Sequence, residues 1–339
     1  MLHFNKERSA SRFAADISLL RDRVKFRRSL VRRLIPAAVY RREMVRRWVI
    51  EKSELDGIKI GLAGTLAERE QAFRLVHDSY VARGIAFPAR SGLKFSPHHI
   101  LPGTTTFVAT RFGRLLGTIS LVEDSPIGLP MEVVHAADIA ALRHTGRRFA
   151  EVSALSVAQD VRGRGIALLL YNALFRWARR HRLIEDLVIA VHPKMREFYC
   201  HGLLFERIGL TREYGALNKA LSMPLRIDLT TAAPRYRDIY DRGDMEVAIA
   251  DRRTNLYRFF LDDVLDCIQL PRFAHPPFTL SSPPAWTDDE VKAYLIDCGV
   301  EVARLPRQVR RLIFATYPRT GEPAPNESEA IHPGFAATA

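Results

Sequence analysis

The sequence contains few cysteines and no apolar run long enough to span a membrane. Its 339 residues include three cysteines, Cys200, Cys267 and Cys298, which lie far apart and show no metal-ligand spacing. We therefore expect reduced thiols, with neither a disulfide framework nor a structural zinc site. The longest nearly continuous apolar stretch, around 166–175, is well short of the roughly 20 residues that cross a bilayer. No signal-peptide pattern opens the sequence and no internal repeat is found, so we expect a folded, cytoplasmic protein.

Positive charge is concentrated in the first part of the chain. The formal net charge is +13, and residues 1–52 hold 15 lysines and arginines against 5 aspartates and glutamates, whereas the rest holds 36 against 33. Apolar residues recur there at helical spacing, at Phe13, Ile17, Leu20, Val24 and Val31. The pattern predicts a basic amphipathic helical arm over 1–56. It could bind an anionic membrane surface, a nucleic acid or an acidic protein, or pack its apolar stripe on the main domain.

Helix and strand patterns alternate from residue 57 to about 230. The Thr65-Leu-Ala-Glu68 string is a capping box, and Phe112-Gly113 is a hairpin turn. The order predicts an α/β protein with a mixed central sheet flanked by helices. The expected elements are strand 58–63, helix 65–83, strands 104–111 and 115–122, helix 135–144, strand 149–157, helix 163–182, strand 186–191, helix 194–201, and a closing antiparallel pair, 205–210 with 217–229.

The composition changes after residue 230. A second capping box at Thr287-Asp-Asp-Glu290 and a proline-rich stretch over 271–285 predict a helical C-terminal appendix over 231–318, interrupted by a connector. Residues 319–339 are dominated by Gly, Pro, Ala, Ser and Glu, a composition typical of a disordered tail.

A glycine-punctuated turn leads from the strand at 149–157 into the central helix. Gly163 and Gly165 let the backbone approach an anion closely, and a helix that starts there presents unpaired N–H groups and the positive end of its dipole. Arg162 and Arg164 add positive charge. The turn predicts a phosphate-binding site, with an ordinary strand-to-helix turn as the alternative.

The order of elements and the Arg162-x-x-Gly165-x-Ala167 turn resemble the GCN5-related N-acetyltransferase (GNAT) superfamily. The resemblance implies that the turn, Gly163 and Arg164 included, holds the phosphate end and the pantetheine arm of an acyl thioester. It also implies that backbone groups of the preceding strand, at about Leu155 to Val157, pair with the pantetheine amides. The edge of that strand must stay unpaired for this contact.

The same resemblance gives two side chains candidate catalytic roles. Glu151 matches the position where many members place a general base, and an amine that is protonated at pH 7 must lose a proton before it attacks. Tyr199 matches the tyrosine that protonates or hydrogen-bonds the leaving thiolate. The alternatives are a solvated carboxylate for Glu151 and a core residue with its hydroxyl at the rim for Tyr199.

A narrower resemblance covers residues 58–229. Strings such as HHILPGTTTFVAT and RRFAEVSALSV look like the long-chain N-acyl amino acid synthases, relatives of the acyl-homoserine lactone synthases. Glu151-Val-Ser153 is similar to the Glu-x-Ser of the lactone synthases, but Ala154 stands where those carry an arginine, which argues against a lactone product. The resemblance implies transfer of a long acyl chain from acyl carrier protein, or from acyl-CoA, to the α-amine of an amino acid, without a metal or redox cofactor.

Under this interpretation, the basic arm suits an acidic carrier protein or the inner face of a membrane. A nucleic-acid partner is not expected. A bidentate arginine would hold the acceptor carboxylate, and other polar residues fall in family-like strings. The candidate acceptor residues are Arg74, Arg83, Arg111, Tyr80, His77, His99 and Ser153. Two alternatives stay open: an acetyl-CoA-dependent N-acetyltransferase of a small amine or protein, and a non-catalytic membrane- or nucleic-acid-binding module.

Overall fold

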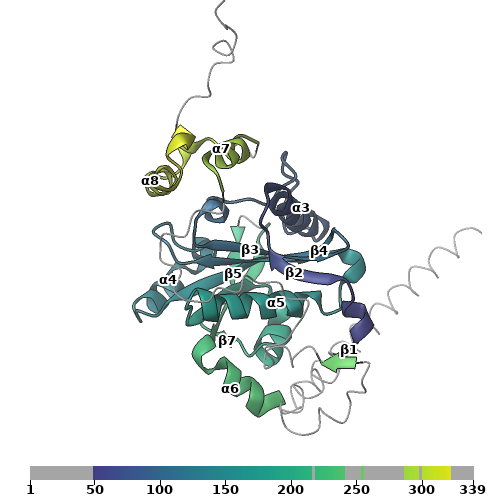
Figure 1. Cartoon of the computed structure of the whole chain (residues 1–339). Helices are drawn as coiled ribbons and strands as arrows, with labels where there is room; N and C mark the ends of the chain where they lie inside the picture. Colours follow the sequence, from purple (N-terminus) through teal and green to yellow (C-terminus); the bar gives the residue numbers. More distant parts are fainter. Residues whose placement is uncertain (1–48, 216–217, 241–252, 256–285, 298–299, 322–339) are drawn as a thin grey trace, which may run out of the picture.

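A computed structural model describes residues 49–215, 218–240, 253–255, 286–297 and 300–321 (Figure 1). The basic arm predicted over 1–56 lies outside the described residues up to residue 48, as do the connector at 271–285 and the tail from residue 322. Residues 319–321, which the composition assigned to the tail, belong to a 3₁₀ turn, Pro318–Gly321.

An eight-stranded mixed sheet forms the centre of the molecule, with strand order β2-β3-β4-β5-β6-β9-β7 and β8 paired to β9. β5 and β6 are parallel, and the other described neighbours in this sheet are antiparallel. β1 (Val49–Glu51) and β10 (Arg253–Asn255) form a separate pair. The strands of the main sheet are β2 (Ile58–Leu62), β3 (Thr104–Arg111), β4 (Arg114–Glu123), β5 (Phe149–Val157), β6 (Asp186–Val191), β7 (Glu206–Arg207), β8 (Arg212–Tyr214) and β9 (Ala220–Asp228).

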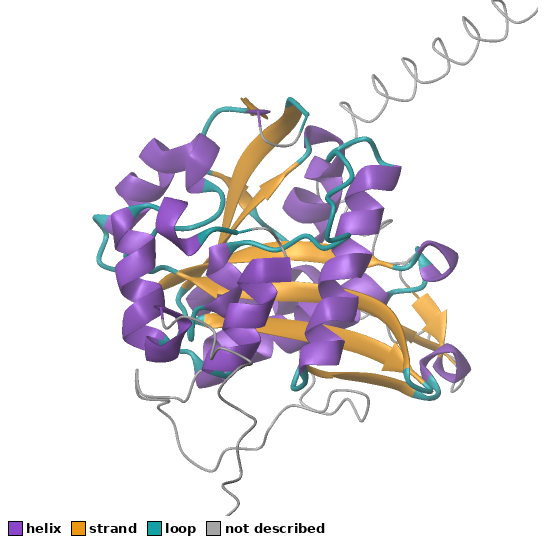
Figure 2. Cartoon of the chain, turned by 90° about the horizontal axis from the view of Figure 1, so that it is seen from above, coloured by secondary structure: helices purple, strands orange, loops and turns teal. Residues whose placement is uncertain are grey.

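Helices cover both faces of the sheet (Figures 1 and 2). α3 and α4 pack on one face, through Val108 and Val122, and α5 and α6 pack on the other, through alternate residues such as Phe107 and Leu121. The α-helices are α3 (Leu66–Ala82), α4 (Glu132–Arg143), α5 (Ile166–Arg176), α6 (Leu229–Tyr240), α7 (Asp288–Asp297) and α8 (Arg307–Thr316). Short 3₁₀ turns span Lys52–Leu55, Pro97–Ile100, Gln159–Val161, Pro193–Met195, Val302–Arg304 and Pro318–Gly321, and π-helical turns span Trp177–His181 and Glu197–Gly202. Within these described segments, no helix is both long and apolar enough to cross a bilayer.

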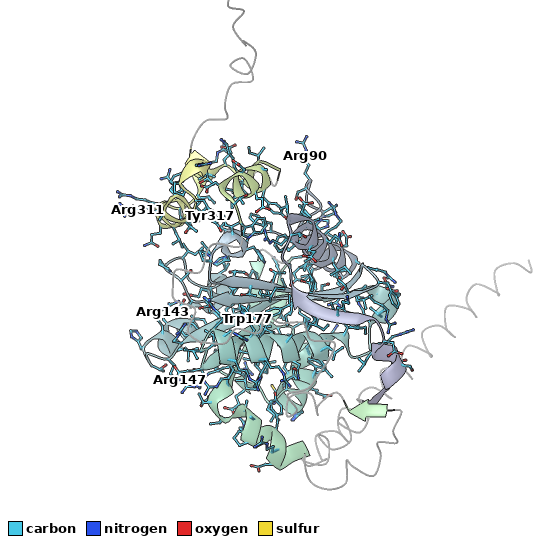
Figure 3. The ribbon with its side chains drawn as sticks, viewed as in Figure 1. Arg90, Arg143, Arg147, Trp177, Arg311 and Tyr317 are labelled. Atoms are coloured by element: carbon cyan, nitrogen blue, oxygen red, sulfur yellow. The ribbon has the colours of Figure 1, made fainter. Side chains whose placement is uncertain are left out.

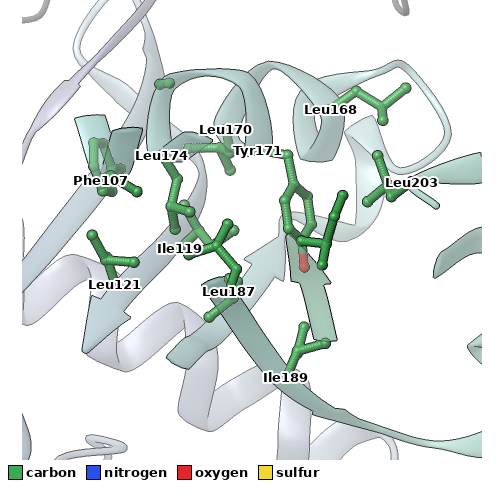
Figure 4. Packing of buried hydrophobic residues seen from close by; sticks show 14 of the residues in the cluster. Phe107, Ile119, Leu121, Leu168, Leu170, Tyr171, Leu174, Leu187, Ile189 and Leu203 are labelled. Atoms are coloured by element: carbon green, nitrogen blue, oxygen red, sulfur yellow. The ribbon is translucent and has the colours of Figure 1, made fainter. Parts of the chain in front are cut away.

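The main core lies between α5 and the sheet (Figure 4). α5 buries Leu168, Leu169, Tyr171 and Leu174, so the apolar stripe of this helix belongs to the core, where each fully buried leucine contributes about 1.5–3 kcal/mol. At Gly117 an added Cβ would lie 3.0 Å from the Ser156 carbonyl oxygen and 3.1 Å from Ile166 and Leu170 side chains. Glycine therefore lets α5 approach β4 closely at this point.

The boundaries of the central helix differ from the prediction of 163–182. The α-helix begins at Ile166 because Gly163 and Gly165 have φ angles of +81° and +78°, which belong to the left-handed region and not to a right-handed helix. Regular α-helix ends at Arg176, and the chain continues as the π-helical turn Trp177–His181. The capping box of α3 is confirmed: Thr65 Oγ1 accepts from the Glu68 N–H at 3.2 Å, and Glu68 Oε2 accepts from the Thr65 N–H at 3.0 Å.

The C-terminal helices α7 and α8 pack on α3 and on the 3₁₀ turn Pro97–Ile100, which follows the long loop after α3. Trp286, Tyr294 and Tyr317 form an aromatic cluster with Phe73 and Ile100. Tyr317 faces this cluster, whereas Arg311 of α8 points outward (Figure 3). The second capping box is also present, since Thr287 Oγ1 accepts from the Glu290 N–H at 3.2 Å. The appendix is thus bound to the main body by aromatic packing that no local sequence pattern indicates.

The predicted boundary at residue 230 falls next to a helix that belongs with the main core. α6 starts at Leu229, and its Leu229, Ala232 and Tyr236 side chains are buried in the core beneath α5. The Tyr236 hydroxyl donates to the Leu203 carbonyl at 2.7 Å. The closing pair of strands is shorter than expected, because Glu206–Arg207 alone pairs with β9 on that side and the unforeseen β8 adds a second partner.

Candidate active site

The two parallel strands of the sheet separate at Glu151. β5 and β6 pair at three positions, of which Glu151 opposite Val188 is the last. β5 nevertheless continues to Val157 and β6 to Val191. Among the described residues, β5 beyond Glu151 has a strand partner only on its β4 side. A free backbone edge therefore runs from Glu151 towards the glycine turn.

A β-bulge interrupts this strand half-way along the free edge. Ser153 pairs with Ser120, and the next pair is Ser156 with Thr118, so that Ala154 and Leu155 together oppose one residue of β4. Ala154 has a φ angle of +53°, which is unusual for a residue with a side chain. A bulge removes backbone groups from the regular ladder and redirects them. Backbone N–H and C=O groups near Leu155 are accordingly available to a partner other than β4.

The glycine turn is anchored to β5 and α3 by Arg162. Its Nε donates to the Val157 carbonyl at 3.1 Å, and its Nη2 donates to Ser79 Oγ at 3.4 Å. Ser79 Oγ also accepts from Ser156 Oγ at 2.6 Å. The Arg162 guanidinium thus holds the turn in position. Arg164, which is exposed, carries the charge that the turn presents to solvent.

Glu151 is a buried carboxyl group that accepts a hydrogen bond from the backbone of the loop before α4. It is 5% exposed, and Glu151 Oε2 accepts a hydrogen bond from the Met131 N–H at 2.8 Å. Burial raises the pKa of Glu151 to about 8, assisted by the charge of Glu132 and opposed by the Met131 hydrogen bond. A carboxyl group with a pKa near neutrality can accept and release protons at physiological pH.

The segment that carries this arrangement matches a known family. Residues 71–228 match the family model described as N-acyl amino acid synthase FeeM. The chain is a GNAT-fold acyltransferase. The match ends at the last residue of β9, so the α6, α7 and α8 helices lie outside it.

Solved structures of acyl-transferring enzymes resemble this acyltransferase at low sequence identity. FeeM, an N-acyl amino acid synthase from uncultured soil microbes, is 28% identical, with 52% of this chain and 93% of FeeM covered and a TM-score of 0.48. The CoA-dependent acyl-homoserine lactone synthase BjaI is 18% identical, with 64% and 96% covered and a TM-score of 0.43. The acyl-homoserine lactone synthase LasI is 16% identical, with 57% and 95% covered and a TM-score of 0.41. No curated protein matches the chain significantly.

Tyr199 lies in the core of the acyltransferase, next to a second tyrosine. It is 4% exposed, and its hydroxyl oxygen accepts a hydrogen bond from the Tyr171 hydroxyl at 3.2 Å. Burial raises the pKa of Tyr199 to about 12; the Tyr171 hydrogen bond and the charge of Arg83 oppose this rise, and Tyr80 adds to it. Tyr199 is therefore protonated at neutral pH and able to donate.

Tyr80 connects the surroundings of Tyr199 with those of Glu151. Burial raises the pKa of Tyr80, the Glu151 carboxylate raises it further, and Arg83 lowers it. Tyr214 of β8 is close to the same groups, since burial and then the proximity of Glu151 and Tyr80 raise its pKa. Its hydroxyl donates to the Pro130 carbonyl at 3.0 Å. Glu151, where β5 and β6 separate, is thus linked electrostatically to Tyr80 and Tyr214, and Tyr80 and Arg83 in turn act on Tyr199.

The other predicted acceptor residues make different contacts. Arg111 donates to the Glu54 carbonyl at the hairpin end of the sheet, and the Arg74 guanidinium lies beside Gly92 of the long loop. His77 Nε2 accepts from the Ala89 N–H at 3.0 Å. Of the three arginines proposed for the acceptor carboxylate, Arg83 is the one whose charge acts on Tyr80 and Tyr199.

His99 belongs to the aromatic cluster under the C-terminal helices. Its ring packs edge-on against Phe73 with a centroid separation of 4.8 Å, and its Nδ1 accepts from the Ser96 N–H at 3.1 Å. Burial lowers the pKa of His99 to about 4, so the ring is neutral at physiological pH. These contacts give His99 a role in packing the appendix onto α3.

Sequence reasoning missed Tyr171, Tyr214 and Met131. Tyr171 lies in an apolar helical stripe and Tyr214 in a strand of three residues, and neither pattern distinguishes a functional tyrosine from a core one. Met131 acts through its backbone N–H, which carries no sequence signal. Among the described residues, no group of three or more His, Cys, Asp or Glu side chains could hold a metal ion.

Proposed function

We propose that this acyltransferase moves a long acyl chain from the phosphopantetheine thioester of acyl carrier protein, or from acyl-CoA, to the α-amine of an amino acid. The main support for this proposal is the position of Glu151, a buried carboxyl group with a pKa of about 8 at the start of the free β5 edge. A base for the amine and a backbone edge for the donor then lie on one strand. The description of the matching family, an N-acyl amino acid synthase, supports acyl transfer to an amino acid.

The donor would lie along the free edge of β5. Its phosphate would meet the turn at Gly163 and Gly165, where both backbones adopt left-handed conformations, with Arg164 exposed beside them and Ala167 in the first turn of α5. The pantetheine amides would pair with backbone groups from Leu155 to Val157. The thioester carbonyl would then face the bulge at Ala154, where a redirected N–H can stabilise the oxyanion.

The reaction requires three proton transfers at this site. Glu151 removes a proton from the ammonium group, and the amine nitrogen then attacks the thioester carbonyl to give a tetrahedral oxyanion. As the intermediate collapses, the carbon–sulfur bond breaks, the thiolate takes a proton from Tyr199, and the nitrogen loses a proton to the site. The products are an amide, a free thiol and one released proton.

Arg83 is the proposed partner of the acceptor carboxylate. It is exposed, it forms the C-cap of α3, and its charge acts on the two tyrosines next to the reacting groups. Replacing Arg83 with glutamine is expected to raise the KM for the amino acid by about tenfold or more, because a charge-assisted pair contributes about 1.5–3 kcal/mol. Arg74→Gln, on the same helix and also exposed, is the matched control. A change in the KM for the donor, with no change for the amino acid, would contradict the assignment.

We propose that the basic N-terminal segment attracts the acyl donor's carrier protein or an anionic membrane. Carrier proteins are acidic, and a segment with 15 basic and 5 acidic residues would attract one at long range. The same segment would attract an anionic membrane into which an amphiphilic product leaves. We propose an arm (1–56), a catalytic domain (57–230) on which α6 also packs, an appendix from residue 231 that extends through the 3₁₀ turn Pro318–Gly321, and a tail after it.

A product screen tests the proposal directly. The full-length protein would be incubated with a pool of amino acids and, separately, long-chain acyl carrier protein, long-chain acyl-CoA and acetyl-CoA, and the products analysed by mass spectrometry. We expect N-acyl amino acids from the long-chain donors. Acetylated products alone would overturn the proposal in favour of an acetyltransferase, and the absence of any transfer would favour a non-catalytic module.

A further inference from the structure

Tyr171 is directed from the central helix to the proposed acid of the reaction. Its ring descends from α5 towards the sheet, with the hydroxyl oxygen at the end away from the helix (Figure 4). The hydroxyl donates to the Tyr199 hydroxyl oxygen at 3.2 Å, and the two rings meet edge-on with centroids 6.0 Å apart. Tyr171 is 2% exposed. Both phenols are thus fixed by the core.

The direction of this hydrogen bond decides what Tyr199 can do. A phenol has one hydrogen to donate and an oxygen that accepts. Because Tyr171 donates, the Tyr199 oxygen is occupied as an acceptor while its own hydrogen is available. Among the described residues, the Tyr199 hydroxyl has no further hydrogen-bond partner. That hydrogen is available for a sulfur atom brought to the site by a donor.

We propose that Tyr171 is a positioning residue for acyl transfer, which orients the Tyr199 hydroxyl towards the leaving thiolate and stabilises the phenolate that forms as Tyr199 gives up its proton. The inference rests on the proposed function, because it requires a thioester donor. It does not require a long acyl chain or an amino acid acceptor. It assigns a function to a side chain that packing alone would explain.

The groups around Tyr199 determine how readily it gives up its proton. Tyr80 of α3 and Arg83 at the end of the same helix act on it electrostatically, while Tyr171 of α5 contacts it through a hydrogen bond. Burial disfavours the phenolate, whereas the Tyr171 hydrogen bond and the Arg83 charge favour it. Burial raises the pKa of Tyr171 well above the ordinary value, and Tyr199 and Tyr236 of α6 add to this rise. Tyr171 therefore stays protonated and remains a donor.

Tyr171 keeps its own proton throughout the catalytic step. The carbon–sulfur bond breaks, the electron pair goes to sulfur, and the Tyr199 proton moves to the thiolate. Tyr199 is briefly a phenolate that accepts the Tyr171 hydrogen bond, which strengthens because its acceptor is now charged. The proton lost by nitrogen as the amide forms restores Tyr199. Only the transition state gains from this bond, so kcat should depend on it and donor KM should not.

A double-mutant cycle tests the inference, with kcat measured on any thioester donor that the enzyme accepts. Tyr199→Phe is expected to lower kcat at least tenfold and Tyr171→Phe about threefold to tenfold, with donor affinity unchanged. If Tyr171 acts through Tyr199, Tyr171→Phe should have almost no further effect on the Tyr199→Phe variant. A donor with a more acidic thiol, such as an acyl thiophenol, needs no acid and should restore the kcat of both single variants.

Tyr236→Phe serves as the control for packing. It removes a buried hydroxyl from the same core, where it donates to Leu203, and should lower stability without changing the dependence of kcat on the thiol. Multiplicative losses in the double variant, or losses that the acidic thiol does not restore, would overturn the inference for Tyr171. Full activity of Tyr199→Phe would overturn it as well, while the transfer reaction found by the product screen would still stand.

Discussion

Replacing Glu151 with glutamine is expected to lower the turnover of the acyltransferase by about 100-fold or more, which is the usual contribution of a general base. Glutamine has the same shape and can still accept the Met131 N–H that now binds Glu151 Oε2 at 2.8 Å. It cannot take a proton from an ammonium group. Binding of the donor, which would contact the β5 edge and the glycine turn, should stay nearly unchanged.

The pH dependence of the wild type and of Glu151→Gln distinguishes a general base from a structural residue. With a Glu151 pKa of about 8, the base is mostly protonated at pH 7 and active above pH 8. The kcat/KM of the wild type should therefore rise with pH through the ionisation of Glu151, because Glu151 deprotonates the ammonium form of the amino acid. The residual rate of Glu151→Gln should follow the amine alone. Glu213→Gln, which changes an exposed carboxylate next to Tyr214, should behave as the wild type. A Glu151→Gln variant within threefold of wild-type turnover would exclude Glu151 as the base.

Local patterns predicted the elements that hold the site. The strand expected at 149–157 is β5 (Phe149–Val157), because alternation and flanking polar residues define it locally. The capping box at Thr65 predicted the start of α3, where side-chain and backbone groups three residues apart satisfy one another. The glycines at 163 and 165 indicated a special turn, but the left-handed angles that delay α5 until Ile166 are a property of the folded chain.

Long-range packing determined what the sequence did not reveal. Glu151 has a raised pKa because the folded chain buries it away from water, and the backbone N–H that it accepts from belongs to Met131, 20 positions earlier in the chain. The Tyr171–Tyr199 bond joins two helical elements 28 positions apart. Trp286 donates to the His99 carbonyl at 3.0 Å across 187 positions. Such contacts depend on how the layers meet, and no periodicity within one element indicates them.

The same carboxyl group should make the folded protein less stable at alkaline pH. In the unfolded chain, the pKa of Glu151 returns to its ordinary value of 4.5, whereas in the folded protein it is about 8. Below pH 4.5 both states hold the proton and the group has no effect on the free energy of unfolding. Between pH 4.5 and 8 the unfolded state releases the proton and the folded state keeps it. The free energy of unfolding therefore falls as pH rises through this window, by about 4 kcal/mol in all.

Glu151→Gln should remove this loss, because an amide does not ionise. Relative to the wild type, the variant is expected to gain about 3 kcal/mol more in free energy of unfolding at pH 8.5 than at pH 5.5. Urea unfolding at the two pH values measures the difference, and Glu213→Gln should show none. A gain independent of pH would mean that the amide merely packs better, and a loss at pH 8.5 would mean that the folded protein stabilises the carboxylate. If the gain follows pH as expected, the substitution that abolishes turnover is also the one that stabilises the fold. The energetic cost of burying Glu151 would then belong to its function as a base.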